Sequence, residues 1–250
     1  MNIFFKSVKY YTFGKRVKTN SVYRNVVGLS DIELSKKPSR TEIINFLLST
    51  FGRSTTYLEI GVRNPEDNYN HVQSIVKYSV DPGVEFENNP VDFPYTSDTF
   101  FKKLEDHEIL PEKIKFDVIF LDGLHTAEQV NRDIINSFKH LSENGFIVLH
   151  DCNPPSEWHA REDYSYYFTP AEYYWSGTVW KAFLKWRGRS EIQSCCVDSD
   201  WGVGILSKNH QLGAAINNFN EFFEFEVLAK NRKELLNLVS FSQLKSSLGY

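Results

Sequence analysis

The feature that most constrains the fold is a series of short apolar segments that end in glycine or in polar residues. Tyr57–Gly61 reads Tyr-Leu-Glu-Ile-Gly, and Phe116–Leu121 reads Phe-Asp-Val-Ile-Phe-Leu. Between such segments lie helical patterns, of which Thr126–Leu141 is the clearest, with an apolar residue every three or four positions. Strands that alternate with helices form βαβ units around a mostly parallel sheet. The sequence therefore predicts an α/β fold.

Weaker signals complete this alternation. Ser39 and Glu42 have the spacing of a capping box before an apolar helix. Asn144-Gly145 is typical of a helix end. We expect further helices at Asn68–Val76, Ser97–Leu104, Val179–Trp186 and Asn220–Leu238. We expect further strands at Lys77–Val80, Asp92–Tyr95 (weak) and Phe146–Leu149, and a closing hairpin at Ile192–Val197 and Val203–Leu206.

The chain divides into three parts: an N-terminal arm (1–38), a central domain (39–208) and a mostly helical C-terminal extension (209–250). The arm has six Lys and Arg residues and no acid within residues 1–30, interleaved with aromatic residues. Such an arm either meets an anionic surface or packs on the domain or a partner subunit, and the lack of a nucleic-acid motif favours packing. The arm and the helical extension leave room for a homodimer.

Bulk composition excludes several classes of protein. The 250 residues carry a net charge of −4, which gives the whole molecule no electrostatic reason to bind nucleic acid. Its three cysteines, Cys152, Cys195 and Cys196, are too few for a disulfide framework and indicate a reduced, cytoplasmic compartment. No apolar stretch has the length of a membrane span.

The residues at the strand ends are the candidates for function, because ligands of open α/β sheets bind at the carboxyl ends of the strands. Gly61 allows a ligand to approach the backbone closely, and the carboxylate of Asp81 can accept both hydroxyls of a ribose. Each signal alone has a structural explanation, such as a turn at Asp81-Pro-Gly83. Together they predict a nucleoside-type ligand at four successive strand ends: Glu59-Ile-Gly61, Asp81, Asp122-Gly-Leu-His125 and His150-Asp151.

The loop after Gly61 narrows the choice of nucleoside. Dinucleotide-binding domains carry Gly-x-Gly-x-x-Gly, so that the pyrophosphate can rest on a helix N-terminus. Here Gly61 is followed by Val62-Arg63-Asn64-Pro65, and the chain has no phosphate-binding Gly-Lys-Ser/Thr loop. A ligand without phosphates is favoured.

These motifs resemble those of class I S-adenosylmethionine-dependent methyltransferases, in particular the small-molecule branch found beside glycosyltransferases in bacterial surface-polysaccharide clusters. The resemblance covers about residues 40–208 and rests on Tyr57–Val62, Tyr78–Pro82, Phe116–His125, Gly145–Asp151, Gly177–Lys181 and Asp200–Gly204. It implies a Rossmann-like three-layer sandwich around a mostly parallel seven-stranded sheet with an antiparallel last strand.

The resemblance also implies roles for individual residues. Glu59 and Gly61 would shape the pocket for the methionine part of the cofactor, with contacts from Arg63 or Asn68. Asp81 would hold the ribose, Ser97 and Asp98 would lie near the adenine, and Asp122 would close the site beside the sulfonium. The cofactor-binding set is Glu59, Gly61, Val62, Arg63, Asn68, Asp81, Ser97, Asp98, Asp122 and Gly123.

Two kinds of catalysis stay open. Asp122 and Asp151 follow strands in the places where metal-dependent relatives bind Mg²⁺, which would lower the pKa of an acceptor hydroxyl. Alternatively, His125 or His150 is the general base of a metal-free site. The histidines also have structural explanations, as a helix cap and as a buried core residue. The predicted catalytic set is His125, His150 and Asp151.

An aromatic loop at 153–178 follows these residues. It is either a lid over a sugar or phenol acceptor, or a flap that packs on the domain or on a second subunit. The favoured function is O-methylation of a small molecule or sugar by an enzyme of polysaccharide biosynthesis. The alternatives are a nicotinamide-dependent oxidoreductase, which the missing glycines count against, and a non-catalytic nucleoside-binding or assembly protein.

Overall fold

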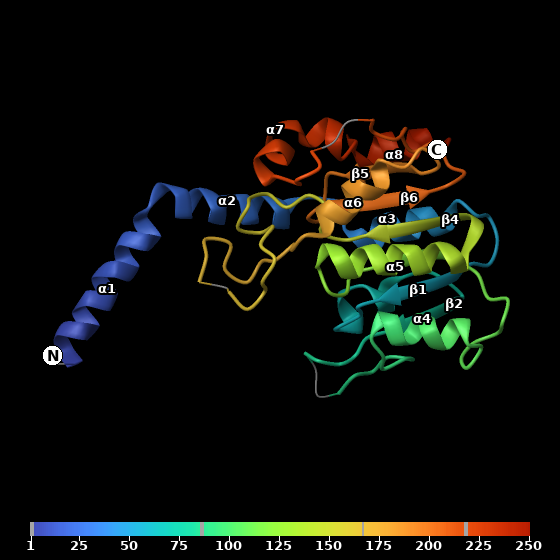
Figure 1. The fold of residues 1–250 in the computed structure, drawn as a ribbon, viewed down its shortest axis with the longest axis horizontal. Coiled ribbons are helices and arrows are strands. Elements are labelled where there is room, and N and C mark those ends of the chain that lie inside the picture. Colours follow the sequence, from blue (N-terminus) through green and yellow to red (C-terminus); the bar gives the residue numbers. More distant parts are fainter. Residues whose placement is uncertain (1–2, 86–87, 167, 218–219) are drawn as a thin grey trace.

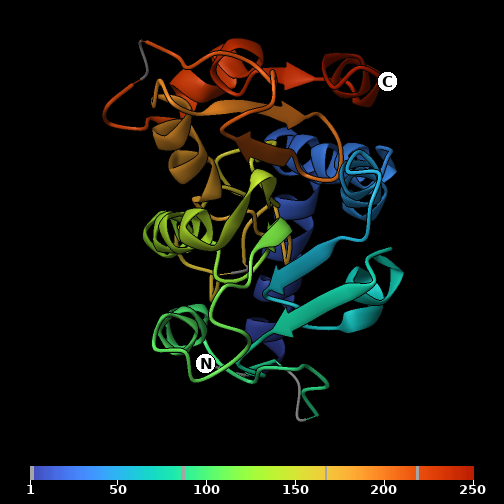
Figure 2. The same ribbon diagram turned by 90° about the vertical axis from the view of Figure 1, so that its right-hand side faces the viewer.

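A computed structural model describes residues 3–85, 88–166, 168–217 and 220–250. Its centre is a seven-stranded sheet with the order β2-β1-β3-β4-β6-β5-β7 (Figures 1 and 2). The strands are β1 (Thr56–Ile60), β2 (Val76–Val80), β3 (Phe116–Leu121), β4 (Leu141–Leu149), β5 (Gln193–Val197), β6 (Val203–Ser207) and β7 (Leu238–Val239).

The sheet is mostly parallel, as predicted. β6 alone runs against its neighbours, β4 and β5, and the other neighbouring pairs of named strands are parallel. β6 is the second strand of the expected closing hairpin, so the hairpin and its antiparallel strand are confirmed. The last strand of the chain is β7, which adds parallel to β5 at the edge of the sheet.

Helices cover both faces of the sheet, which gives the predicted three-layer sandwich. Since both faces are covered, β3 is buried at every position, with Asp117 as its one charged residue. One core cluster joins the sheet to α4 (Ser97–Glu105), α5 (Ala127–His140), α6 (Val179–Arg187) and α7 (Phe225–Leu235). The cluster on the other face includes α3 (Arg40–Ser49) and α8 (Phe241–Ser247).

The N-terminal arm forms α1 (Ile3–Thr19) and α2 (Ser21–Ser35). Figure 1 shows α1 pointing away from the sheet and α2 leading back to it. The end of α2 is fixed to the domain, since the Lys36 ammonium lies 2.6 Å from the Glu33 carboxylate and 2.8 Å from that of Asp198. α3 then begins with the predicted capping box of Ser39 and Glu42.

Four local predictions differ from the structure. The expected helix at Asn68–Val76 is two short 3₁₀ turns, Pro65–Asp67 and Tyr69–His71, and Val76 already belongs to β2. Asn144-Gly145 does not end a helix but lies inside β4, because α5 ends at His140. The C-terminal extension is helical only at 225–235 and 241–247 among its described residues. The weak strand near Asp92–Tyr95 is reduced to a single bridge between Val80 and Phe93.

Candidate active site

The turn after β1 packs directly against the loop after β3. Gly61 has a φ of 87°, which glycine adopts without strain. A Cβ on Gly61 would lie 2.3 Å from the Cα of Gly123 and 2.4 Å from the carbonyl oxygen of Asp122. Glycine is therefore required by its backbone conformation and by its contact with the second loop. Val62, the next residue, is buried.

Glu59 and Asn68 meet in the interior beside this turn. The hydroxyl of Tyr57 donates to a Glu59 oxygen at 2.6 Å, and the Asn68 amide donates to the same oxygen at 2.8 Å. Burial raises the pKa of Glu59 to about 7, although both hydrogen bonds favour the carboxylate. Asn68 also accepts from the Thr41 hydroxyl at 2.7 Å, which connects β1 to α3. Both predicted residues are thus buried and bonded to each other beside the Gly61 turn.

Asp81 holds the loop that follows Gly61. One carboxylate oxygen accepts the Arg63 amide at 2.9 Å, and the other accepts the Gly83 amide at 2.7 Å. Each carboxylate oxygen has a second lone pair, so Asp81 can still accept ligand hydroxyls. The Arg63 side chain turns outward and its Nε lies 2.9 Å from Glu85. The unusual loop is therefore held by its backbone, with Arg63 itself at φ 51°.

Ser97 and Asp98 begin α4, on the same side of the sheet as α5. The Gln129 amide donates to the Ser97 hydroxyl at 3.0 Å and to the Asp98 carboxylate at 3.2 Å. Arg132 lies 3.4 Å from Asp98. These bonds fix the start of α4 against α5, and Asp98 stays exposed to solvent.

The loops after β3 and β4 bring four of the predicted residues together. His150 Nδ1 lies 2.9 Å from the Asp151 carboxylate and 3.2 Å from the Asp122 carboxylate. His125 Nε2 lies 3.2 Å from Asp122, and its Nδ1 lies 3.4 Å from Asp151. The two histidines and two carboxylates predicted from separate strand ends thus form one group at the carboxyl edge of the sheet.

Two further residues, missed by sequence reasoning, complete this group. The Asp200 carboxylate lies 3.2 Å from His150 Nε2, and it also accepts the Arg40 backbone amide at 2.6 Å. The Arg40 guanidinium lies 3.4 Å from Asp200 and 3.8 Å from Asp122. We call these six residues the charged cluster: Arg40, Asp122, His125, His150, Asp151 and Asp200.

Arg40 and Asp200 come from elements outside the βα loops. Arg40 is the first residue of α3, and Asp200 lies in the turn of the β5–β6 hairpin. In that turn Asp200, Trp201 and Gly202 have φ values of 46°, 63° and 88°. The capping box and the Asp200-Trp-Gly motif were the available signals. Neither signal indicates that Arg40 or Asp200 lies beside the end of β4.

The charges of the cluster balance. Burial disfavours the imidazolium of His125, but Asp151 and Asp122 outweigh it and raise the pKa to about 9. Burial is likewise outweighed at His150, where Asp122 and Asp151 hold the pKa well above its ordinary value. Burial would raise the pKa of Asp122, but His150, His125 and Arg40 lower it. At neutral pH three carboxylates therefore face three cationic groups.

The aromatic loop 153–178 lies over the cluster. Trp175 stacks on His125 with ring centroids 5.1 Å apart, and its carbonyl oxygen lies 3.1 Å from His125 Nδ1. Tyr164 packs on the other side of Trp175, also at 5.1 Å. His159 is fully buried and lies 2.9 Å from the Ser30 hydroxyl of α2. The loop thus joins the arm to the cluster.

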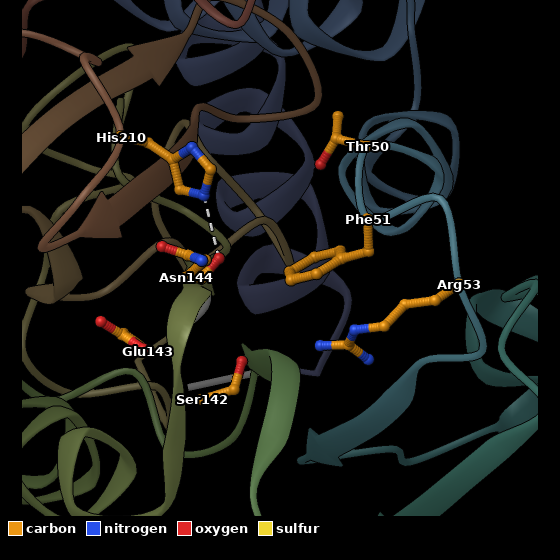
Figure 3. A pocket seen from close by; sticks show the side chains of 7 residues that line it. All are labelled: Thr50, Phe51, Arg53, Ser142, Glu143, Asn144 and His210. Atoms are coloured by element: carbon orange, nitrogen blue, oxygen red, sulfur yellow. Dashed lines mark hydrogen bonds between the residues drawn. The ribbon is translucent and has the colours of Figure 1, made fainter.

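A separate hollow of about 400 Å³ lies at the opposite edge of the sheet. Figure 3 shows its lining, from Thr50–Arg53 before β1, from the first half of β4 and from His210. None of its lining residues belongs to the charged cluster or to the loops after Gly61 and Asp81. We therefore place the candidate site at the carboxyl edge, where the charged side chains converge.

One family model matches part of this chain. Residues 49–152 match the model of a family described as a methyltransferase domain. The match includes β1 to β4 and reaches the loop after β4, so it contains every predicted site residue. The resemblance to class I methyltransferases is confirmed, and the polysaccharide branch stays a prediction. Among curated proteins, no relative matches the chain.

Solved structures resemble the methyltransferase domain at low identity. An O-methyltransferase from Bacillus cereus in complex with S-adenosylhomocysteine (SAH) is 12% identical, with a TM-score of 0.44, 80% of this chain covered and 95% of that one. An SAH-bound methyltransferase from Podospora anserina is 12% identical, with a TM-score of 0.44, covering 84% and 98%. A putative caffeoyl-CoA O-methyltransferase from Staphylococcus aureus is 13% identical, with a TM-score of 0.44, covering 80% and 99%.

Proposed function

We propose that this chain transfers a methyl group from S-adenosylmethionine to an oxygen atom of a small molecule or sugar. The observation that carries the proposal is the contact between the Gly61 turn and the Asp122-Gly123 loop. Through this contact, the turn with Gly61, which together with Asp81 is proposed to bind the nucleoside part of the cofactor, lies beside the loop that carries Asp122 of the charged cluster. A cofactor and an acceptor bound at this edge would meet where the two halves touch.

The residues present fit the cofactor. Asp81 keeps a lone pair on each oxygen for the ribose hydroxyls, and Gly61, which has no side chain, lets the turn after β1 meet the Asp122-Gly123 loop. Asp122 supplies negative charge beside the expected position of the sulfur. When bound, S-adenosylmethionine would supply a methyl group on a positively charged sulfur, and the predicted cofactor-binding set would hold it.

His125 is the proposed general base. It lies beneath the aromatic loop, stacked on Trp175, and contacts two carboxylates, whereas His150 contacts the three carboxylates of Asp122, Asp151 and Asp200. Asp151 and the Trp175 carbonyl oxygen orient the His125 ring through Nδ1, and the acceptor proton would pass to Nε2 in place of the contact between Nε2 and Asp122. His150, His125 and Arg40 would keep Asp122 ionised, because they lower its pKa. Loop 153–178 would enclose the acceptor and exclude water, with aromatic faces that suit a sugar or phenol.

A Mg²⁺ site at Asp122 and Asp151 is the alternative. One ligand atom from each of Asp122, His125 and Asp151 lies within 4.8 Å of the other two. However, both carboxylates already contact imidazole nitrogens, and Mg²⁺ prefers oxygen ligands in octahedral geometry. A cation would have to displace these contacts, so the donor set fits the metal poorly. We therefore favour a metal-free site.

Calorimetry with SAH and with NAD tests the proposal. We expect SAH to bind at micromolar to millimolar concentration and NAD not to bind. NAD binding without SAH binding would instead support an oxidoreductase, and binding of neither would support an assembly protein. A screen of sugars, nucleotide sugars and phenols with labelled S-adenosylmethionine then identifies the acceptor. SAH binding without transfer to any hydroxyl would contradict the O-directed activity.

A further inference from the structure

α1 combines positive charge with exposed aromatic side chains. The six positive charges within residues 1–30 leave the remainder of the chain ten charges negative, since the whole chain is at −4. Tyr10, Tyr11 and Phe13 expose 70%, 74% and 66% of their surface, and Val8 is also exposed. Figure 1 shows this helix projecting beyond the body of the protein. A surface of this size and character indicates a partner.

The arrangement of these side chains favours a protein partner over a membrane. At 100° per residue, Val8, Tyr10, Tyr11 and Phe13 point to all sides of the helix. A helix that lies on a membrane needs one apolar face and one charged face. α1 has no such division, because its basic and aromatic side chains are interspersed around the helix, which suits contact with an acidic and aromatic protein surface.

Loop 153–178 has the complementary character. It contains four acids, Glu157, Glu162, Asp163 and Glu172, and one basic residue, Arg161. The Arg161 guanidinium is bonded to the carbonyl oxygens of Trp158, Tyr174 and Glu172 within the loop. Tyr164 and Tyr166 are exposed on it. The loop therefore presents acidic and aromatic groups, where α1 presents basic and aromatic groups.

Within one chain, α2 already contacts this loop. The Tyr23 hydroxyl donates to the Glu172 carboxylate at 2.7 Å, and Ser30 contacts His159. These contacts belong to α2, and α1 continues outward past them (Figure 1). The acids Glu157, Glu162 and Asp163 remain exposed.

We propose that α1 of one copy docks on loop 153–178 of a second copy, and that the contact is reciprocal. A helix of this length is about 25 Å long and about 10 Å wide, so it presents on the order of 800 Å². A stable interface buries about 800 Å² per partner. Two reciprocal arms therefore supply enough surface for a two-fold dimer. The partner's arm would lie on the loop that covers the charged cluster.

Charge reversal on the two surfaces tests the dimer. The arm variant is Lys6→Glu/Lys9→Glu/Lys15→Glu, and the loop variant is Glu157→Lys/Glu162→Lys. Light scattering at about 50 µM, with circular dichroism to confirm folding, should give the mass of two chains for the unaltered protein and of one chain for each variant. An equimolar mixture of both variants should recover the mass of two chains, because each arm then meets a loop of opposite charge. Lys113→Glu, at an exposed lysine of the body, is the control and should stay dimeric.

Several results would overturn the proposal: a monomeric unaltered protein, a dimer that survives arm reversal, or variants that fail to recover dimers on mixing. Co-sedimentation of the unaltered protein with phosphatidylglycerol vesicles but not phosphatidylcholine vesicles, as a monomer, would assign the arm to a lipid surface instead. SAH binding is measured on the same samples. Its presence or absence tests the proposed function separately, because the dimer does not depend on the cofactor.

Discussion

Gly61→Ala isolates the contact that joins the two halves of the site. Alanine in the left-handed conformation costs about 1–2 kcal/mol. Its Cβ would also meet backbone atoms of Asp122 and Gly123 at 2.3–2.4 Å, which forces the loops apart. Overpacking of this kind costs about 1–3 kcal/mol. We expect the free energy of unfolding to fall by roughly 2–5 kcal/mol, which for a chain of this size lowers the Tm by about 2–4 °C per kcal/mol.

Gly52→Ala is the matched control. Gly52 has a φ of 60°, but a Cβ there would meet no atom within 4 Å. We expect Gly52→Ala to lower the free energy of unfolding only by the cost of the left-handed backbone conformation, about 1–2 kcal/mol. Urea unfolding measures both variants, and calorimetry with SAH should show weaker binding for Gly61→Ala alone. Equal destabilisation of the two variants, with SAH affinity unchanged in both, would refute the requirement for close contact at Gly61.

The remaining predictions concern the cofactor, the base and the metal. Asp81→Ala should weaken SAH binding at least about 100-fold, because it removes charge-assisted bonds worth about 1.5–3 kcal/mol each; unchanged affinity in calorimetry would contradict the ribose contact. His150→Ala should spare SAH binding but lower turnover and stability, since it leaves buried carboxylates without a counter-charge; a turnover assay and urea unfolding check this. Because the pKa of His125 is raised to about 9, the unprotonated base is scarce at neutral pH, so turnover should rise about tenfold from pH 7 to 8 and level off above 9. A profile that is flat from pH 7 to 9 would exclude His125 as the base. EDTA should leave turnover unchanged, and its loss, restored by Mg²⁺, would support the metal site.

The strand ends were predictable because each follows a buried apolar strand. The sheet, the closing hairpin and the grouping of Asp122, His125, His150 and Asp151 all follow from that pattern. Arg40 and Asp200 were not predictable, because they reach the cluster from a helix start and a hairpin turn. The two elements are far apart along the chain, so no local sequence pattern indicates that they are in contact.

The wrong helix at Asn68–Val76 has a physical explanation. Its apolar residues, Val72, Ile75 and Val76, have helical spacing, but only Val72 is buried and Ile75 is 81% exposed. Side chains from outside this segment bond its backbone, in place of the regular hydrogen bonds of a helix. The Lys77 ammonium donates to the carbonyl oxygens of Tyr69 and Val72, and Asn45 bonds His71 and Gln73. These partners lie elsewhere in the chain or in the following strand, so the spacing of apolar residues gives no sign of them.

The three cysteines lie in the core of the protein. Cys152, Cys195 and Cys196 are buried and unpaired with one another, and burial raises the pKa of each thiol, so they are inert core residues. None of the helices in the described ranges is long and apolar enough to cross a membrane.

A crystal structure with SAH bound tests the central claim most directly. The ribose should lie on the Asp81 carboxylate, and the thioether sulfur should lie over the Gly61 turn and face Asp122 and the charged cluster. The adenine should lie near Ser97 and Asp98. SAH bound instead in the hollow at the amino edge, lined by Thr50, Arg53 and His210, would contradict the account, as would a ligand at the carboxyl edge without contact to Asp81.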